Sequence, residues 1–239
     1  MSLYLDSADL SAVSEALSWG IEGITTNPSI LAKDGATSVI GRCKDIVDLV
    51  CEDYTACKGG FHLSVEILNV YDPDKAEDEA KTILRLLQND YFTPTIKVPL
   101  VPNGIGLKII KRLHEYEIPV NATCLMSPLQ AVLAAEAGAD YVSLFYNRMI
   151  DYNTKVREMD ESVARREAMF DIQVARDLVK PDANLIVGSI RKTTDVLEAL
   201  ESDADIVTVP YKYLLELQTH PKTDEAIKEF EEKWKAVTG

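Results

Sequence analysis

The sequence predicts an α/β protein of the (β/α)8 class, a TIM barrel with one extra helix at its C-terminus. Short apolar runs alternate with longer stretches of helical period eight times along the chain, and such alternation is typical of βαβ units in a parallel sheet. Eight units in a chain of 239 residues favour a closed barrel over an open sheet, because one such barrel takes about 250 residues. No linker or low-complexity segment breaks the alternation, so we expect residues 1–239 to form a single domain.

Each apolar run is a candidate strand. In a closed barrel both faces of a strand are buried, one against the helices and the other against the barrel interior. Because parallel strands point the same way, their C-terminal ends meet at one mouth of the barrel. The runs are Leu3–Leu5, Gly23–Thr25, His62–Ile67, Thr95–Val98, Pro119–Ala122, Tyr141–Leu144, Leu185–Val187 and Asp205–Val209.

The stretches between the runs predict helices, and two of them carry clear end signals. Asp72 stands at the N-cap position of Pro73–Gln88, whose first residue is a proline. Ser127 caps Pro128–Ala137, and Gly138 ends that helix. A third helix, over residues 106–116, is indicated by apolar residues on one face.

The C-terminal part of the chain has features that the strand–helix alternation does not explain. Asp151–Met159 is the least regular stretch, and a charged helix, Asp160–Val179, follows it. Arg165 in that helix is expected to lie on a solvated face. Residues 222–237 predict an additional amphipathic helix, which covers the barrel or docks on a neighbouring subunit. Its apolar stripe consists of Ile227, Phe230 and Trp234.

The composition argues against several classes of function. A formal net charge of −14 disfavours nucleic acid or an anionic membrane surface as a partner, and no apolar run approaches the ~20 residues of a membrane span. The first residues lack the basic region of a signal peptide, so we expect a soluble cytoplasmic protein with free thiols. Metal-site spacings such as CxxC or HExxH are absent, so no metal is expected. The cysteines are Cys43, Cys51, Cys57 and Cys124.

Polar or charged residues end most of the predicted strands. Enzymes with this barrel carry their chemistry at the C-terminal ends of the strands. A single polar strand end could be a satisfied hydrogen bonder, but so many at one mouth are hard to explain by stability, because each costs desolvation free energy unless it is paired. We therefore expect an active site there. These residues are Asp6, Asn27, Glu66, Lys97, Asn121, Thr123, Ser143, Ser189 and Arg191.

Lys97 is the candidate nucleophile. Side chains alternate between the two faces of a strand, so if Ile96 and Val98 pack outward on the helices, Lys97 points into the barrel. Burial beside few carboxylates disfavours the ammonium form and frees the amine to attack a ketone. The resulting iminium accepts electrons when a carbon–carbon bond breaks, without any metal. The alternative is a lysine whose stem reaches back to solvent.

Schiff-base chemistry also needs proton transfers, and Asp6 and Glu66 are the candidates for them. Asp6 could instead cap the first helix, and Glu66 could be an ion-pair partner within the mouth. Thr123 could hold a water molecule, or it could only pack as a β-branched strand residue.

A phosphate site is indicated beyond the ends of the sixth and seventh strands. Arg148 and Arg191 lie there with Ser189 nearby, and guanidinium groups make bidentate contacts with phosphate. This part of a (β/α)8 barrel is also a frequent place for phosphate binding. The alternative for either arginine alone is a surface ion pair.

Taken together, these motifs resemble the small-subunit transaldolase and fructose-6-phosphate aldolase family of Schiff-base-forming (class I) aldolases, over essentially the whole chain. TTNPS followed by IKVP at this separation is a specific combination, whereas IKVP alone would be weak. The matching pieces are Tyr4–Ala8, Thr25–Ser29, Ser64–Glu66, Ile96–Pro99, Asn121–Thr123, Gln130–Ala139, Asn147–Arg148 and Gly188–Arg191.

The resemblance implies a role for each of these positions, and no cofactor. Lys97 would form the Schiff base with a ketose phosphate, and Asp6 would be the acid–base group that cleaves and remakes the carbon–carbon bond. Glu66 and Thr123 would hold the water that shuttles protons. Substrate would be bound by Thr26, Asn27, Asn121, Ser143 and Phe145, and its phosphate by Arg148, Ser189 and Arg191.

Two positions separate the activities within the family. Transaldolase-like members carry Glu and Phe where aldolase-like members carry Gln and Tyr, and here they are Glu66 and Phe145. A tyrosine hydroxyl could protonate the enamine or position water beside it. Phenylalanine cannot, so the enamine should survive until an aldehyde arrives.

We therefore expect a transaldolase of the pentose phosphate pathway. It would transfer a dihydroxyacetone unit from sedoheptulose 7-phosphate or fructose 6-phosphate to glyceraldehyde 3-phosphate or erythrose 4-phosphate. The alternatives are a fructose-6-phosphate aldolase-like enzyme that uses free dihydroxyacetone, and a catalytically weak sugar-phosphate-binding barrel.

The chain departs from the family pattern beside the expected mouth. The loop Leu100–Ile105 and residues 151–167 are longer than usual, and Tyr146 and Asn147 replace a common Val-Gly pair. Family members are usually oligomers, and the C-terminal helix carries an apolar stripe. We therefore expect a homo-oligomer, with a pentamer or decamer suggested by the resemblance.

Overall fold

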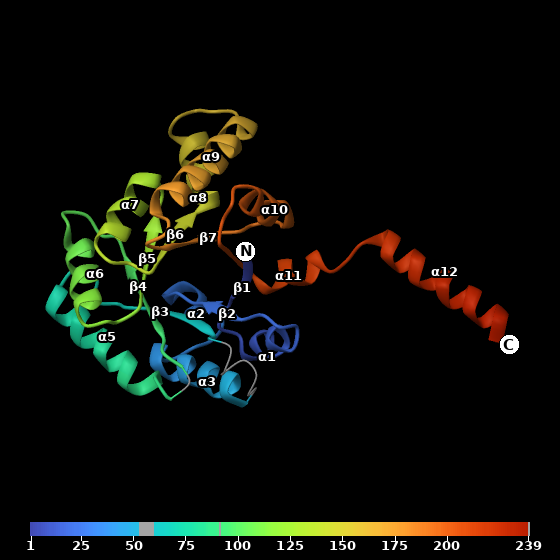
Figure 1. The fold of residues 1–239 in the computed structure, drawn as a ribbon, viewed down its shortest axis with the longest axis horizontal. Helices are drawn as coiled ribbons and strands as arrows, with labels where there is room; N and C mark the ends of the chain where they lie inside the picture. Colours follow the sequence, from blue (N-terminus) through green and yellow to red (C-terminus); the bar gives the residue numbers. More distant parts are fainter. Residues whose placement is uncertain (53–59, 91, 239) are drawn as a thin grey trace.

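The computed structural model, which describes residues 1–52, 60–90 and 92–238, is a closed barrel of eight parallel strands joined by helices (Figure 1). Neighbouring strands follow the chain order, and the first pairs with the last to close the ring. The prediction of a (β/α)8 barrel is therefore confirmed. The strands are β1 Ser2–Asp6, β2 Gly23–Thr25, β3 His62–Glu66, β4 Thr95–Pro99, β5 Val120–Leu125, β6 Tyr141–Phe145, β7 Asn184–Gly188 and β8 Ile206–Val209.

Helices surround the barrel, and those predicted from the sequence are present with ends shifted by one or two residues. The two predicted N-caps are confirmed, because the side chains of Asp72 and Ser127 accept hydrogen bonds from backbone N–H groups of the first turn. The helices are α1 Leu10–Ser18, α2 Pro28–Lys33, α3 Val39–Glu52, α5 Pro73–Leu87, α6 Ile105–Glu115, α7 Pro128–Glu136, α8 Tyr146–Lys155, α9 Glu161–Val179, α10 Thr193–Glu201, α11 Tyr211–Leu217 and α12 Pro221–Thr238.

The main hydrophobic core lies between the strands and the helices. Ile96 and Val98 of β4 are fully buried in it, as strand alternation predicts. The other face of each strand looks into the barrel, and that interior is largely polar. Its buried polar side chains are Thr25, His62, Ser64, Thr95, Lys97, Asn121, Thr123, Ser143 and Thr208. A polar interior inside an apolar shell leaves hydrogen-bonding groups available near the mouth.

One stretch differs from its prediction. Asp151–Met159, expected to be irregular, begins within α8, which runs to Lys155. The helix forms because Met149, Ile150 and Asn153 present one buried face to the rest of the protein. Lys155 also pairs with Asp151 one turn earlier, at 2.8 Å, which supports the helix locally.

The C-terminal helix α12 extends away from the barrel rather than covering it (Figure 1). Ile227 and Phe230 are 50% and 65% exposed. Of the two placements expected for this helix, covering the barrel of its own chain is therefore not the one observed.

Among the cysteines, Cys43 and Cys124 are free thiols, and Cys57 lies outside the described residues. Cys51 Sγ accepts a hydrogen bond from Asn89 Nδ2 at 3.4 Å. Within the described ranges, no helix is long and apolar enough to cross a membrane. Those ranges also contain no group of three or more His, Cys, Asp or Glu side chains that could hold a metal ion.

Candidate active site

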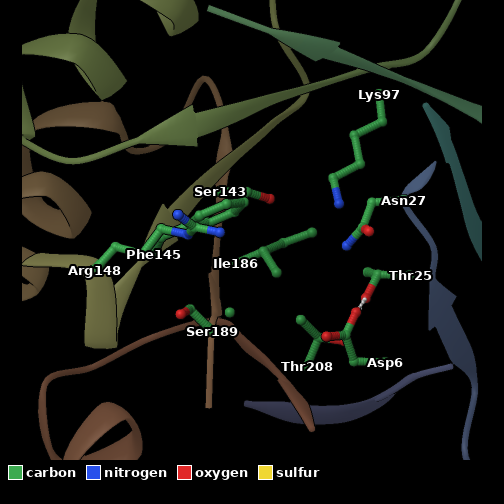
Figure 2. A pocket seen from close by; sticks show the side chains of 11 residues that line it. Asp6, Thr25, Asn27, Lys97, Ser143, Phe145, Arg148, Ile186, Ser189 and Thr208 are labelled. Atoms are coloured by element: carbon green, nitrogen blue, oxygen red, sulfur yellow. Dashed lines mark hydrogen bonds between the residues drawn. The ribbon is translucent and has the colours of Figure 1, made fainter. Parts of the chain in front are cut away.

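A cavity of about 130 Å³ opens at the C-terminal ends of the strands. Figure 2 shows Lys97, Asn27 and Asp6 on one side of it and Phe145, Arg148 and Ser189 on the other. Most of the residues predicted from strand ends and motifs are therefore gathered around one space. The predicted residues that line it are Asp6, Asn27, Lys97, Ser143, Phe145, Arg148 and Ser189.

Lys97 points into the barrel and is only 4% exposed, so the alternative of a lysine reaching solvent does not apply. Its Nζ donates a hydrogen bond to the backbone carbonyl of Thr26 at 3.0 Å. Glu66 Oε2 lies 3.7 Å from the same nitrogen. The expectation of few carboxylates near the lysine is therefore wrong. The amine has an ion-pair partner in the Glu66 carboxylate.

The TTNPS motif places Thr26 and Asn27 in different roles. The Thr26 side chain is buried and donates to the carbonyl of Ser64 at 2.9 Å, so its backbone oxygen, not its hydroxyl, faces Lys97. Asn27 Oδ1 caps α2 by accepting from the N–H of Ile30 at 2.9 Å, and Pro28 takes the first helical position. This cap turns the amide nitrogen of Asn27 toward the cavity (Figure 2).

Asp6 is held by the hydroxyl of Thr25, which is itself bonded to the hydroxyl of Thr208. Thr25 Oγ1 donates to Asp6 Oδ1 at 2.7 Å, and Thr208 Oγ1 lies 2.5 Å from Thr25 Oγ1. The first helix is capped by Asp9 instead, so the alternative role of Asp6 as a helix cap is excluded. Thr25 and Thr208 are not among the site residues predicted from the sequence, although strand alternation places both on the inner face.

Both carboxyl groups near Lys97 retain their protons more readily than exposed ones. Burial raises the pKa of Asp6, and the nearby charge of Lys97 and the hydrogen bond from Thr25 only partly offset it. Burial likewise raises the pKa of Glu66 against the opposing effect of Lys97. A raised pKa moves a carboxyl group in the direction that favours general acid–base catalysis.

Asn121 is oriented by a chain of hydrogen bonds that crosses the barrel interior. Its Nδ2 donates to Ser64 Oγ at 2.9 Å, and its Oδ1 accepts from Ser143 Oγ at 2.7 Å. Ser64 Oγ is also bonded to His62 Nε2 at 2.7 Å. Burial lowers the pKa of His62 to about 3, so the ring is neutral at physiological pH. We call these four residues the interior chain.

Thr123 lies at an irregular point of β5. The pairing of β5 with β6 shifts register between Ala122 and Leu125, and Cys124 has a φ of 61°. The hydroxyl of Thr123 is buried and has no hydrogen-bond partner among the described residues. A buried hydroxyl in this situation needs a further partner to be satisfied.

The predicted phosphate residues are only partly brought together. Arg148 and Ser189 line the cavity. Arg191 does not; its side chain is 51% exposed and pairs with Asp151 Oδ2 at 2.6 Å. For Arg191 the alternative of an ion pair near the surface therefore describes this structure. That contact also holds the pKa of Asp151 well below its usual range.

Arg165 is not on a solvated face, contrary to expectation. Its side chain is 11% exposed and its Nη2 lies 2.6 Å from the fully buried carboxylate of Asp195. The two residues are 30 positions apart, and neither forms a motif with its neighbours. No local signal in the sequence could have paired them.

Comparison with known proteins finds a family model and relatives that match almost the whole chain. A family model described as transaldolase/fructose-6-phosphate aldolase matches residues 3–238. A protein named probable transaldolase from Geobacter sp. (strain M21) is 34% identical over 99% of both chains. One of the same name from Caldicellulosiruptor saccharolyticus is 33% identical over 99% of this chain and 98% of its own length. A third, from Thermoplasma volcanium, is 31% identical over 100% of this chain and 97% of its own.

Among solved structures, thiamine phosphate pyrophosphorylase from Pyrococcus furiosus superposes with a TM-score of 0.54, covering 87% of this chain and 85% of its own. At 16% identity this likeness concerns the fold alone. The match to the family model, by contrast, spans nearly every residue, and full-length relatives share about a third of their sequence with the chain. The chain therefore belongs to the transaldolase/fructose-6-phosphate aldolase family.

Proposed function

We propose that the protein is a transaldolase that carries a dihydroxyacetone unit from a ketose phosphate to an aldose phosphate as a Schiff base on Lys97. Sedoheptulose 7-phosphate and fructose 6-phosphate would be the donors, and glyceraldehyde 3-phosphate and erythrose 4-phosphate the acceptors, as in the pentose phosphate pathway. The observation that carries the proposal is the Lys97 amine, buried in the cavity within 3.7 Å of the Glu66 carboxylate.

The first half of the reaction forms the covalent intermediate. The ammonium group of Lys97 passes a proton to Glu66, and the free amine attacks the ketose carbonyl carbon, C2. Protonation of the new hydroxyl and its loss as water leave an iminium. Thr123, whose hydroxyl has no partner among the described residues, would hold this water together with Glu66.

The second half breaks and remakes the carbon–carbon bond. Asp6 takes the proton from the C4 hydroxyl, the C3–C4 bond electrons move into the iminium, and an aldose phosphate leaves. The enamine that remains on Lys97 then attacks the carbonyl carbon of a second aldose, and Asp6 returns the proton to the new hydroxyl. Hydrolysis of the product iminium frees Lys97, so no oxidant or reductant is required.

The two sides of the cavity suit the two ends of such a substrate. Lys97 and Asp6 lie on the side opposite Arg148 and Ser189 (Figure 2), so a ketose with C2 at the lysine could extend its phosphate toward the arginine. Arg191 would join this contact by exchanging Asp151 for the phosphate. Asn27, Asn121 and Ser143 would contact the hydroxyl groups between the two ends.

Phe145 favours transfer over release of free dihydroxyacetone. It lines the cavity and has no hydroxyl with which to protonate the enamine. The relatives at about a third identity carry the name probable transaldolase, which agrees with this preference. We further propose that the protein works in the cytoplasm as a homo-oligomer, with the exposed apolar residues of α12 contributing to assembly.

Borohydride trapping tests the central step. Reduction in the presence of fructose 6-phosphate is expected to add one dihydroxyacetone-derived group to the peptide that contains Lys97, detected by peptide mass. Lys97→Met should abolish the adduct, whereas the control Lys33→Met, at an exposed lysine, should keep it. An active protein without an adduct on Lys97 would remove the proposal.

Addition of free dihydroxyacetone to glyceraldehyde 3-phosphate separates the transaldolase from an aldolase of the same family. We expect slow addition relative to transfer from fructose 6-phosphate; efficient addition would favour the aldolase. Thermal stabilisation by fructose 6-phosphate without any turnover would favour a barrel that only binds sugar phosphates.

A further inference from the structure

Asp195, at the start of α10, carries a carboxylate that is 0% exposed and accepts hydrogen bonds from three parts of the fold. Its Oδ2 accepts from the N–H groups of Arg191 and Lys192, at 2.8 and 3.1 Å. The same oxygen accepts from Asn147 Nδ2 at 2.7 Å, and Oδ1 accepts from Arg165 Nη2 at 2.6 Å. The bond from Lys192 belongs to the cap of α10, but the others reach beyond what a cap requires.

Asn147 joins the two halves of the candidate phosphate site. It precedes Arg148 in α8, and its Nδ2 donates both to Asp195 Oδ2 and to the carbonyl of Ser189, at 2.7 and 2.8 Å. Ser189 has a φ of 62°, a left-handed conformation that is unfavourable for a residue with a side chain. The hydrogen bonds to Asn147 and Asp195 hold the turn in that conformation.

Arg165 compensates the charge of the buried carboxylate. An unpaired anion beneath a phosphate-binding turn would repel the phosphate, and burying it alone would be costly. The guanidinium contacts Asp195 and also Glu198 Oε2, at 3.0 Å, and Tyr146 donates to the same oxygen at 2.7 Å. Helices α8, α9 and α10 and the turn after β7 thus meet at one ion pair.

We propose that Asp195, Asn147 and Arg165 are positioning residues that fix the positions of Arg148, Ser189 and Arg191 relative to one another. They thereby set the preference for phosphorylated over unphosphorylated ketoses. This inference rests on the proposed function, because it concerns the phosphate end of the same site. None of the three residues lines the cavity that contains Lys97, so their loss should weaken phosphate recognition and leave the Schiff-base step intact.

Two donors that differ only in the phosphate test whether the three residues affect phosphate recognition and not the Schiff-base step. Transfer from fructose 6-phosphate and from fructose to the same unphosphorylated acceptor, erythrose, gives sedoheptulose in both cases, and kcat and KM are measured for each donor. Asp195→Asn, Arg165→Met and Asn147→Ala are each expected to lower kcat/KM at least about tenfold for fructose 6-phosphate, mainly through KM. The value for fructose should change less than about twofold.

Two control variants accompany the measurement. Arg165→Lys keeps a positive charge and should recover part of the preference that Arg165→Met loses. Glu161→Gln removes an exposed carboxylate 3.7 Å from Arg165 and should leave both donors unchanged. Should Asp195→Asn fail to fold, Asn147→Ala carries the test, because it removes the bond to Ser189 and keeps the buried ion pair.

The failure of this inference is distinguishable from failure of the proposed function. If both donors lose activity in parallel while borohydride still traps dihydroxyacetone on Lys97, the three residues are structural only and the inference is overturned. If the wild-type protein forms no adduct on Lys97 with either donor, the proposed function itself fails.

Discussion

Lys97 shares its surroundings with two carboxyl groups, and each has a distinct set of neighbours. Glu66 lies beside the amine, at 3.7 Å from Nζ, whereas Asp6 is held by the hydroxyl of Thr25 at 2.7 Å. The pKa of each carboxyl is raised, by burial in both cases. In the proposed mechanism this separation lets Glu66 serve the water that enters and leaves at C2, and Asp6 serve the C4 hydroxyl.

Phe145 and Glu66 are expected to decide whether the enamine is transferred to an aldehyde or protonated and released as dihydroxyacetone. Phe145→Tyr combined with Glu66→Gln should raise the rate of dihydroxyacetone addition to glyceraldehyde 3-phosphate relative to transfer, because a phenol that lines the cavity can deliver, directly or through water, the proton that releases the three-carbon unit. The ratio of the two rates measures the effect. Phe92→Tyr, at a buried aromatic outside the cavity, serves as the control, and an unchanged ratio in the double variant would contradict the assignment.

His62 should make stability depend on pH. Its pKa is about 3 in the folded protein and ~6.5 in an unfolded chain, so the unfolded state binds more protons between these values. The stabilising contribution is complete above pH ~6.5 and is lost as pH falls toward 3, at up to ~1.4 kcal/mol per pH unit.

The comparison of pH 7 with pH 5 by thermal or urea unfolding measures this effect. His62→Gln should lose less stability over that interval than the wild type, because the glutamine does not titrate. His220→Gln changes an exposed histidine and should behave like the wild type. Equal pH dependence in all three proteins would show that His62 titrates alike in the folded and unfolded states.

At the scale of elements, helix ends depend on single residues. Gly138 follows α7 with a φ of 99°, and an added Cβ would stand 2.3 Å from Cγ of His114 on the neighbouring helix α6. Gly138→Ala should therefore be destabilising by more than the ~1–2 kcal/mol of the left-handed conformation alone.

Gly35 provides a matched control for this substitution. It has a φ of 76°, and nothing lies within 4 Å of the position that a Cβ would take, so Gly35→Ala should show the conformational cost only. Unfolding free energies of the two variants give the comparison. A smaller loss for Gly138→Ala than for Gly35→Ala would mean that α6 and α7 separate easily.

In the whole molecule, α12 extends away from the barrel with Ile227 and Phe230 exposed, and the proposed homo-oligomer assigns this helix a part in assembly. Phe230→Glu is expected to lower the mass of the assembly measured by sedimentation velocity, because it places a charge on the exposed apolar side. Lys228→Glu introduces the same residue on the opposite side of the helix and should leave the mass unchanged. An unaltered mass in Phe230→Glu would exclude this helix from the contact between subunits.

Much of the fold and the inward direction of Lys97 could be predicted from the sequence, because both depend on local periodicity. Alternation along Ile96, Lys97 and Val98 is enough to place the lysine inside the barrel. The same reasoning applies to Thr25 and Thr208. It could not find the pairing of Arg165 with Asp195, because distant segments meet only after the barrel has closed.

The remaining differences also have tertiary causes. Asp151–Met159 has a weak pattern, and its first part is helical because α8 packs on the rest of the molecule. Arg191 follows the end of β7 as predicted, but its side chain turns to Asp151. A strand pattern predicts the backbone position of a residue. It does not predict which partner a long side chain will contact.

The interior chain connects the His62 imidazole to the cavity, so the NMR signals of this ring can report on occupancy of the site. His62 lies near the start of β3 and Ser143 at the cavity, and Ser64 and Asn121 connect them through hydrogen bonds of 2.7–2.9 Å. In the proposed function a sugar hydroxyl contacts Asn121, and such a contact would draw electron density along these bonds. The imidazole nitrogens of His62 would then change their NMR frequencies when the opposite end of the barrel is occupied, so occupancy can be followed without a label near the reacting atoms.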